Sequence, residues 1–303
     1  MQSELIRLAS ELAAPDAVDG VTRLGLGGAA LLRRTRPSDI EGTLYRPLLC
    51  LVLQGAKEVI AGTLSVHCPA GHAIIVSHDL PVLSRITRAS PAEPYIAVVL
   101  PLDLGLLRGF FDQMPDIAEG ADNPAALMAC TAERELSDAV ARFLALARQQ
   151  AAAPLLAPIL LREIHARLLL SPQGAILRRF LYREDPSNHV ARAIASIHAS
   201  IDAPMKVSAL AEHAGMSTSS FHAHFKAVTG LTPGQYQKDI RLHEARRLIL
   251  DSTAAVASVA FDVGYESPAQ FSRDYARKFG RPPREDRSTA REPGRPQTLS
   301  NSI

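Results

Sequence analysis

The sequence contains no tryptophan, only three cysteines and few aromatic residues, 5% of the total. Cys50, Cys68 and Cys130 are odd in number and have no metal-ligand spacing, which argues against a disulfide framework and favours reduced thiols in a cytosolic protein. The longest apolar run, "AAAPLLAPILL" at 151–161, contains two prolines and is far shorter than the roughly 20 residues of a membrane span. The N-terminus has no apolar signal core. These absences predict a cytoplasmic protein with no membrane partner.

The composition is otherwise that of a globular protein. The 303 residues are 47% apolar and 21% charged, and a chain of this length holds roughly two domains. Residues 190–303 contain 15 Lys and Arg against 11 Asp and Glu, a balance of +4 in a chain whose net charge is +2. This mild excess permits a polyanionic partner for the C-terminal part, but a solvated basic surface explains it equally well.

The hydrophobic period changes along the chain. Between residues 44 and 101, short runs rich in Val, Ile and Leu are separated by turn residues, which predicts an antiparallel barrel or jelly roll. From Leu102 the pattern is helical, including "LMACTAERELSDAVARFLALARQ" at 127–149 and "ILLREIHARLLL" at 159–170. The polar stretch "YREDPSNH" indicates a domain boundary after residue 183, and the apolar-poor tail at 284–303 is predicted to be disordered.

An internal duplication occupies the C-terminal part. At an offset of 49 residues, one set of positions recurs: Val207, Leu210, Ala211 and Gly215 return as Val256, Val259, Ala260 and Gly264. At an offset of 50, a second set recurs: Ser217, Phe221, Phe225, Gly230 and Pro233 return as Ser267, Phe271, Tyr275, Gly280 and Pro283. The sequence therefore repeats one structural unit.

Each unit has the features of a helix-turn-helix motif. A short amphipathic helix ends at Gly215 or Gly264, because glycine adopts positive φ at little cost. A second helix follows, capped by Ser217 or Ser267, with its aromatic residues on the inner face. Between the units, the capping box that starts at Thr232 opens a helix to about Leu250, which would fix the spacing of the two second helices.

The stretch "VASVAFDVGYESPAQFSRDYARKFGRPPRE" resembles the signature of the AraC/XylS transcriptional regulators, and the resemblance covers residues 184–283. "YRPLLCLVLQGAKEVIAG", within residues 44–101, resembles the cupin-like N-terminal domain of a subgroup of that family. The resemblance implies an α+β protein: a cupin-like sensing and dimerising domain with accessory helices at 1–183, and an all-α DNA-binding domain at 184–283. It further implies a small-molecule effector, a homodimer and contacts with RNA polymerase, as expected of a promoter activator.

Helical geometry selects the residues that would touch DNA. If the aromatic residues face the core, the opposite faces of the two second helices carry the following candidates: Ser219, His222, Ala223 and Lys226 in the first unit, and Ala269, Gln270, Ser272 and Arg273 in the second. Arg273 is the leading candidate for a base contact, because a guanidinium binds guanine with two hydrogen bonds. Each of these residues could also be merely solvated, and Gln270 could serve only as the capping-box partner.

The sequence admits three other interpretations. A cupin metal enzyme would need clustered ligands, but His72 and His78 would lie about 20 Å apart on one strand, and His67 brings no carboxylate motif. We therefore expect no enzymatic activity, metal or cofactor. The helix-turn-helix units could instead serve protein contacts in a ligand-binding protein. Cys50 or Cys68 could sense electrophiles, although buried inert thiols are the simpler expectation.

Overall fold

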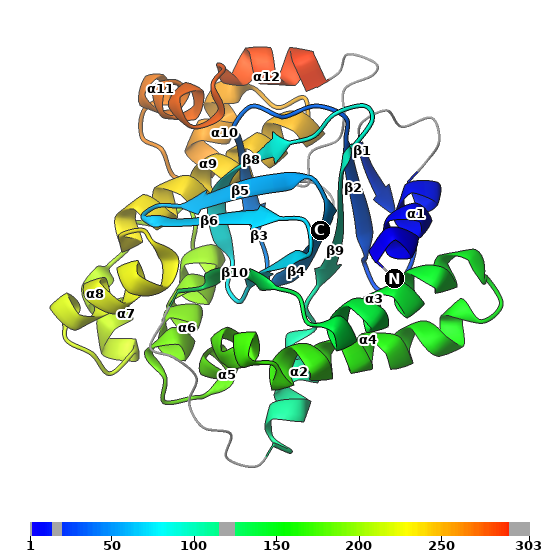
Figure 1. Ribbon diagram of the computed structural model, residues 1–303. Helices are drawn as coiled ribbons and strands as arrows, with labels where there is room; N and C mark the ends of the chain where they lie inside the picture. The colour runs from blue at the N-terminus through cyan, green and yellow to red at the C-terminus, as the bar shows by residue number, and fades with distance from the viewer. Residues whose placement is uncertain (1, 14–19, 115–124, 291–303) are drawn as a thin grey trace.

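The computed structural model describes residues 2–13, 20–114 and 125–290 (Figure 1). A six-stranded antiparallel sheet has the order β1-β2-β9-β4-β7-β10, with bounds Gly20–Arg23, Ala30–Arg34, Tyr95–Pro101, Leu48–Gln54, His72–Val76 and Leu127–Thr131. A four-stranded antiparallel sheet has the order β3-β8-β5-β6, with bounds Glu41–Tyr45, Leu80–Arg88, Ala56–Ala61 and Leu64–Pro69.

Helices surround this β domain and follow it. The helices of the N-terminal part are α1 (Gln2–Leu12), α2 (Leu104–Phe111), α3 (Arg134–Ala145), α4 (Ala153–Leu170) and α5 (Ala175–Leu181), with short 3-10 turns η1 (Leu146–Arg148) and η2 (Pro172–Gly174). The C-terminal helices are α6 (Pro186–Ala199), α7 (Val207–His213), α8 (Thr218–Thr229), α9 (Pro233–Asp251), α10 (Val256–Asp262), α11 (Pro268–Phe279) and α12 (Pro283–Ala290). The expected α+β class is confirmed.

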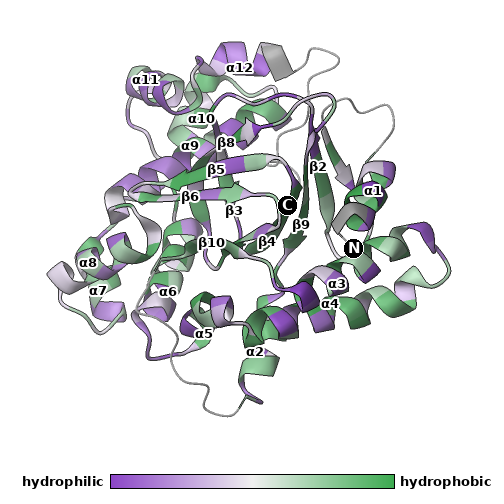
Figure 2. Cartoon of the chain, in the orientation of Figure 1, coloured by the Kyte–Doolittle hydropathy of each residue, from purple (hydrophilic) through white to green (hydrophobic). Residues whose placement is uncertain are grey.

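The six-stranded sheet is buried on both faces, which explains its unbroken apolar strands. In β4, Cys50 and Val52 belong to the core that the two sheets share. Leu49 and Leu51 belong to a second core, formed with α1, α3 and α4. Successive side chains of a strand point to opposite faces of the sheet. The sequence of a strand that is covered on both faces is therefore continuously hydrophobic. In Figure 2, β9 is accordingly hydrophobic along its length, whereas α12 is largely hydrophilic.

The β region extends beyond the predicted residues 44–101. Strands β1 and β2 precede it, and β10 lies within the stretch 127–149 that was predicted to be helical. Residues 127–131 instead pair with β7 along the sheet edge, and the helix begins only at Arg134. A short apolar run fits a buried strand as well as a helix, so the unpaired edge of β7 decides its conformation.

The prediction that residues 284–303 form a disordered tail is wrong for the first seven of these residues. Residues 284–290 continue α12, while residues 291–303 lie outside the described part of the chain. The helix is held by Asp286, which is fully buried and pairs with Arg246 at 2.8 Å. The Tyr275 hydroxyl donates a hydrogen bond to the same carboxylate at 2.8 Å. One buried ion pair thus orders a segment whose composition is almost entirely polar.

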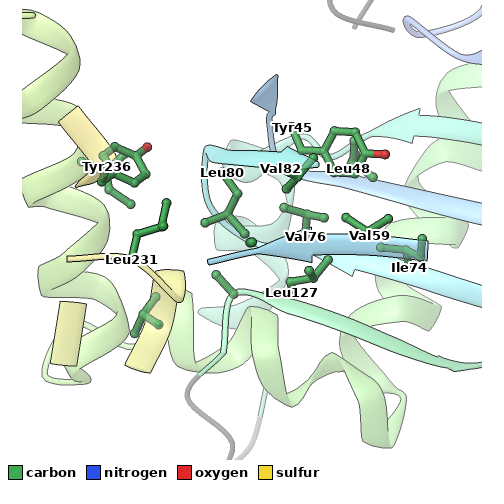
Figure 3. Packing of buried hydrophobic residues seen from close by; sticks show 14 of the residues in the cluster. Tyr45, Leu48, Val59, Ile74, Val76, Leu80, Val82, Leu127, Leu231 and Tyr236 are labelled. Atoms are coloured by element: carbon green, nitrogen blue, oxygen red, sulfur yellow. The ribbon is translucent and has the colours of Figure 1, made fainter. Parts of the chain in front are cut away.

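The β domain and the C-terminal helices share one hydrophobic core. Tyr236 of α9 and Leu231, which precedes it, lie in the same cluster as Leu80 and Val82 of β8 (Figure 3). The Tyr236 hydroxyl also donates a hydrogen bond to the backbone oxygen of Asp79 at 2.8 Å. The C-terminal helices are therefore packed on the β domain, with a continuous core between them.

Main-chain hydrogen bonds join the same two parts. The Ala126 N–H donates to the Val228 oxygen at 2.8 Å, and the Thr63 N–H donates to the Gly230 oxygen at 3.0 Å. A Cβ atom on Gly62 would lie 2.1 Å from the Gly230 oxygen, so this close approach of the two backbones requires glycine. The turn between β5 and β6 thus lies directly against the C-terminal end of α8.

None of the helices in the described ranges is long and apolar enough to cross a membrane.

Candidate nucleic-acid interface

The two repeated units have the predicted helix-turn-helix geometry. Gly215 follows α7 with φ +65°, and Gly264 follows α10 with φ +82°. The Ser217 hydroxyl accepts a hydrogen bond from the Ser220 N–H at the start of α8. Ser267 caps α11 in the same way. Left-handed glycines end the first helices and serine side chains begin the second ones, as the duplicated sequence predicts.

The aromatic residues of both second helices form the cores of their units. Phe221 and Phe225 of α8 are completely buried, and their rings lie 5.6 Å apart. Phe271 and Tyr275 of α11 are also completely buried, with the same centroid separation of 5.6 Å. Because these pairs face inward at four-residue spacing, the opposite face of each helix is turned to solvent.

The four predicted contact residues of α8 lie on its exposed face. Ser219, His222, Ala223 and Lys226 are all exposed. The Ser219 hydroxyl lies 3.1 Å from the Ser217 hydroxyl, so it shares the capping network at the start of the helix. The Lys226 side chain makes no hydrogen bond or ion pair with another described residue. Its charge is therefore available to an anion such as a phosphate.

Three of the four predicted contact residues of α11 are equally exposed. Ala269, Gln270 and Arg273 face solvent, whereas Ser272 is half-buried. The Ser272 hydroxyl donates a hydrogen bond to the Pro268 oxygen at 2.9 Å, so its donor is already used inside the helix. The second capping box is incomplete, because the Gln270 side chain makes no bond back to Ser267. This leaves the Gln270 amide free for an external partner.

Neighbouring cations of α11 are neutralised, which distinguishes Arg273 from them. The buried carboxylate of Asp274 pairs with Lys238 at 2.8 Å and with Arg277 at 2.7 Å. Lys278 pairs with Asp239 at 2.6 Å. Arg273 makes no such pair within the described part of the chain. An exposed guanidinium with no internal partner has all five N–H donors available for recognition.

The linker helix α9 begins with the predicted capping box, formed by Thr232 and Gln235, and ends at Asp251. Its Arg241 guanidinium donates hydrogen bonds to the backbone oxygens of Ile201, Asp202, Ala203 and Gly264 at 2.7–3.1 Å. These oxygens belong to the loop before α7 and to the turn after α10. The Arg241 side chain thereby fixes the linker helix to both units. No local sequence pattern identifies this role of Arg241.

The three histidines considered as metal ligands do not assemble. His67 is exposed on β6, and His78 lies beyond the end of β7 instead of on one strand with His72. Burial lowers the pKa of His78 to about 4. Its Nε2–H donates to the Ser187 oxygen at 2.9 Å, and its Nδ1 accepts from the Ser77 hydroxyl at 2.8 Å. Both ring nitrogens are therefore occupied, and within the described residues no cluster of three or more metal-binding side chains occurs.

Two of the three thiols of the β domain are buried among its strands, and Cys130 is half-buried. Cys50 and Cys68 are at most 3% exposed, and burial raises the pKa of both. Burial raises the pKa of Cys130 to about 11. Thiols in this state are protonated at neutral pH and are poor nucleophiles. The arrangement favours the inert interpretation of Cys50 and Cys68 over electrophile sensing.

Two family profiles match the chain. The profile described as "AraC-type transcriptional regulator N-terminus" matches residues 26–176, and the profile described as "Helix-turn-helix domain" matches residues 210–289. Among curated proteins, the chain is 28% identical to the HTH-type transcriptional regulator ExsA of Pseudomonas aeruginosa over 134 residues, which is 44% of this chain and 48% of ExsA. It is 38% identical to the HTH-type transcriptional activator RhaS of Escherichia fergusonii over 79 residues, 26% of this chain and 28% of RhaS.

Solved structures of ToxT from Vibrio cholerae share the fold. An apo ToxT variant superimposes with a TM-score of 0.57 at 9% identity, covering 88% of this chain and 97% of ToxT. A ligand-bound ToxT superimposes with a TM-score of 0.58 at 11% identity, covering 86% and 98%. The matches to ExsA and RhaS, in contrast, span less than half of those proteins.

The fold and the paired helices define a DNA-binding protein of the helix-turn-helix class with a β-sheet N-terminal domain. The chain belongs to the AraC/XylS family of transcriptional regulators.

Proposed function

We propose that this protein binds double-stranded promoter DNA through α8 and α11 and adjusts that binding in response to a small molecule. The observation that carries the proposal is the repeated pair of capped helices, each with a buried aromatic face and an exposed outer face. We assign effector sensing to residues 1–183 and DNA binding to residues 184–283, in a cytoplasmic protein. Activation of transcription through RNA polymerase is the mode of action that we favour.

The linker helix has a suitable length for this task. At 1.5 Å per residue, the 19 residues of α9 span about 28 Å. Helices that enter successive major grooves on one face of B-DNA lie roughly 34 Å apart. Arg241 connects α9 to both units by hydrogen bonds. The folded domain would therefore fix the spacing between α8 and α11. This geometry supports simultaneous insertion of α8 and α11.

The outer faces suggest a division of roles. In the first unit, Lys226 would bind a phosphate, His222 or Ser219 would meet a base edge, and Ala223 would allow close approach or contact a thymine methyl. In the second unit, Arg273 would read a guanine, Gln270 an adjacent base, and Ala269 would permit close approach. We assign no base contact to Ser272, because its hydroxyl is already engaged with Pro268.

A small-molecule effector is supported by the β domain and by precedent. ToxT has been crystallised with (E)-4-(8-methylnaphthalen-1-yl)but-3-enoic acid and with an unsaturated fatty acid. Here the β domain shares a continuous core and backbone hydrogen bonds with the C-terminal helices. A ligand that alters the β domain would therefore act directly on the orientation of α8.

The outer face of α4 is our candidate for the dimer contact. Leu155 and Ile159 are 75% and 61% exposed, and Leu156 beside them is 43% exposed. Exposed leucine and isoleucine side chains that cluster on one helix are typical of a protein–protein contact. We predict a homodimer that Leu155→Glu together with Ile159→Glu converts to monomer in sedimentation equilibrium. The exposed Leu170→Glu, at the far end of the same helix, is the matched control, and equal dissociation in both variants would argue against this face.

The decisive experiment is a footprint of the purified protein upstream of its own gene, at two salt concentrations. We expect protection of two adjacent major-groove segments. Affinity should fall with salt at a log-log slope of about −0.9 for each phosphate contact. If the helix-turn-helix units serve protein contacts instead, protection will be absent or independent of salt.

A further inference from the structure

A cavity lies where the β domain meets the first helix of the DNA-binding domain. Its volume is about 280 Å³, just below the range of roughly 300–1,000 Å³ that is typical of ligand pockets. The β domain and its helices contribute one wall, and α6 contributes the other. The lining residues are Pro47, Ser77, His78, Asp79, Leu104, Phe180, Ala191, Ile194, Ala195 and His198.

The apolar part of this cavity arises from the sequence of α6. Ala191, Ile194, Ala195 and His198 follow helical spacing, so they share the face of α6 that is turned to the β domain. The two alanines of this face have short side chains, which leave space between α6 and the β domain. The walls are therefore mainly hydrocarbon and suit the apolar body of a small molecule.

One lining residue of the cavity is a histidine whose two ring nitrogens have no capacity left for a ligand. His78 donates to the Ser187 oxygen and accepts from the Ser77 hydroxyl, and its ring packs edge-on against Phe180 with centroids 5.0 Å apart. The His78 side chain is therefore held in place, and its bond to Ser187 connects the start of α6 to the β domain.

The next residue along the chain, Asp79, also lines the cavity and presents a carboxylate to it. Among the described residues, none donates a hydrogen bond to the side chain of Asp79, which is 29% exposed. His198 Nε2 lies 3.6 Å from Asp79 Oδ2, but it lies closer, at 3.3 Å, to the Tyr236 hydroxyl oxygen. That hydroxyl donates its own proton to the Asp79 backbone oxygen, so the His198 N–H is directed at Tyr236. The carboxylate oxygens therefore have no donor from the described part of the protein and face the cavity and solvent.

The charges around Asp79 favour a cation as its partner. Burial lowers the pKa of His198, so this imidazole is neutral at neutral pH and does not balance the carboxylate. Burial raises the pKa of Asp79, and the exposed Arg46 opposes this increase without forming an ion pair with the carboxylate. A ligand ammonium group would supply N–H donors and a positive charge in direct contact with the carboxylate.

We propose that this cavity binds a small primary amine, with its ammonium group on Asp79 and its hydrocarbon body between Ala191, Ala195 and Phe180. Its role as the effector site rests on the proposed function. The ligand would contact α6 of the DNA-binding domain and residues 77–79 of the β domain together. Its binding would therefore stabilise one arrangement of the two parts over others.

Three probes of similar size and shape test the chemistry: cyclohexylmethylamine, cyclohexylmethanol and cyclohexanecarboxylate, each titrated into the full chain by calorimetry at neutral pH. We expect the amine to bind at least about tenfold more tightly than the alcohol, and the carboxylate to bind least. Preferential binding of the carboxylate, or equal binding of all three probes, overturns the proposal.

Two variants locate the site. Asp79→Asn preserves the backbone oxygen that Tyr236 uses and should abolish the preference for the amine over the alcohol. Ala195→Leu should block all three probes by filling the cavity. The exposed Asp251→Asn is the matched control and should bind as the unmodified chain does. An unchanged amine preference in Asp79→Asn, with an unchanged circular dichroism spectrum, contradicts the assignment.

The footprint separates this inference from the proposed function. Amine binding that changes operator protection supports both the amine site and the proposed function. Amine binding without any operator protection supports the amine site and contradicts its role in regulation. Operator protection with no binding of the amine leaves the regulator intact and rejects the amine site.

Discussion

At the scale of single residues, neighbouring cations on one helix face have different roles. Arg277 and Lys278 of α11 are engaged with Asp274 and Asp239, so their charges stabilise the fold. Arg273, one turn earlier, is exposed and has no partner among the described residues. DNA recognition is therefore best assigned to Arg273, whose charge makes no ion pair within the described fold.

Arg273→Ala should cost about 1–3 kcal/mol of operator binding and relax specificity at one base pair, because the variant loses a bidentate base contact. Competition binding against operators mutated one position at a time measures both effects. Arg277→Ala on the same helix is the control and should retain the sequence preference. If Arg273→Ala keeps its affinity and its base preference, Arg273 does not read DNA.

At the scale of elements, α12 shows how one buried ion pair can organise a polar segment. Asp286 receives Arg246 from α9 and Tyr275 from α11, so three helices meet at a single carboxylate. The guanidinium of Arg246 also lies over the Phe279 ring, 4.7 Å from its centroid. α12 therefore packs against the second helix-turn-helix unit and stabilises it.

Asp286→Ala should destabilise the protein by about 3–5 kcal/mol, because it leaves the buried Arg246 charge without a counter-ion. Urea denaturation followed by circular dichroism measures the loss, and operator protection by α11 should weaken with it. The exposed Arg284→Ala on the same helix should change stability by less than about 0.5 kcal/mol. Equal stability of the two variants would show that the ion pair does not hold α12.

At the scale of the whole molecule, the contact between the β domain and the DNA-binding domain depends on histidines that must stay neutral. His78 bridges the β domain to the start of α6, and its pKa is lowered to about 4 by burial. His243 of α9 is buried beside Phe279 and lies against Gly42 of β3, and burial also lowers its pKa. Protonating either ring would place a charge in this contact.

The unfolded chain takes up a proton on His78 near the ordinary pKa of 6.5, whereas the folded chain does so only near 4. Stability is therefore present in full above pH 6.5 and falls as the pH is lowered from 6.5 to 4, by on the order of 3 kcal/mol for this residue. Thermal denaturation between pH 7 and pH 5 should show a smaller decline in His78→Gln than in the unmodified chain. His222→Gln, at an exposed position, should decline as the unmodified chain does, and identical declines in both variants would contradict this role of His78.

Local patterns were sufficient for the parts of the fold whose contacts are close in sequence. The glycine turns, the serine caps and the inner faces of α8 and α11 depend on residues one to four positions apart, so periodicity predicts them. Strand β10 and helix α12 were not predicted, because their conformations depend on β7 and on Arg246, which lie far away in the sequence. Arg241 was missed for the same reason.

The candidate DNA-contact residues followed from helical geometry alone, and seven of the eight lie exposed on the outer faces of α8 and α11. Ser272 is the half-buried one, and only the structure shows that its hydroxyl is already bonded. The cavity at Asp79 could not be foreseen, because its walls come from the segment after β7 and from α2, α5 and α6. That no described residue donates to its carboxylate depends on where Tyr236 directs its hydroxyl.

The sequence by itself determined the duplication, the two helix-turn-helix units and the α+β class, because these features are encoded in spacings of a few residues. The tertiary structure alone decided how the β domain rests on α8, which cations remain unpaired and where a cavity remains between the two parts. Those properties depend on groups that meet only after the chain has folded, and their energies come from burial and from partners distant in sequence.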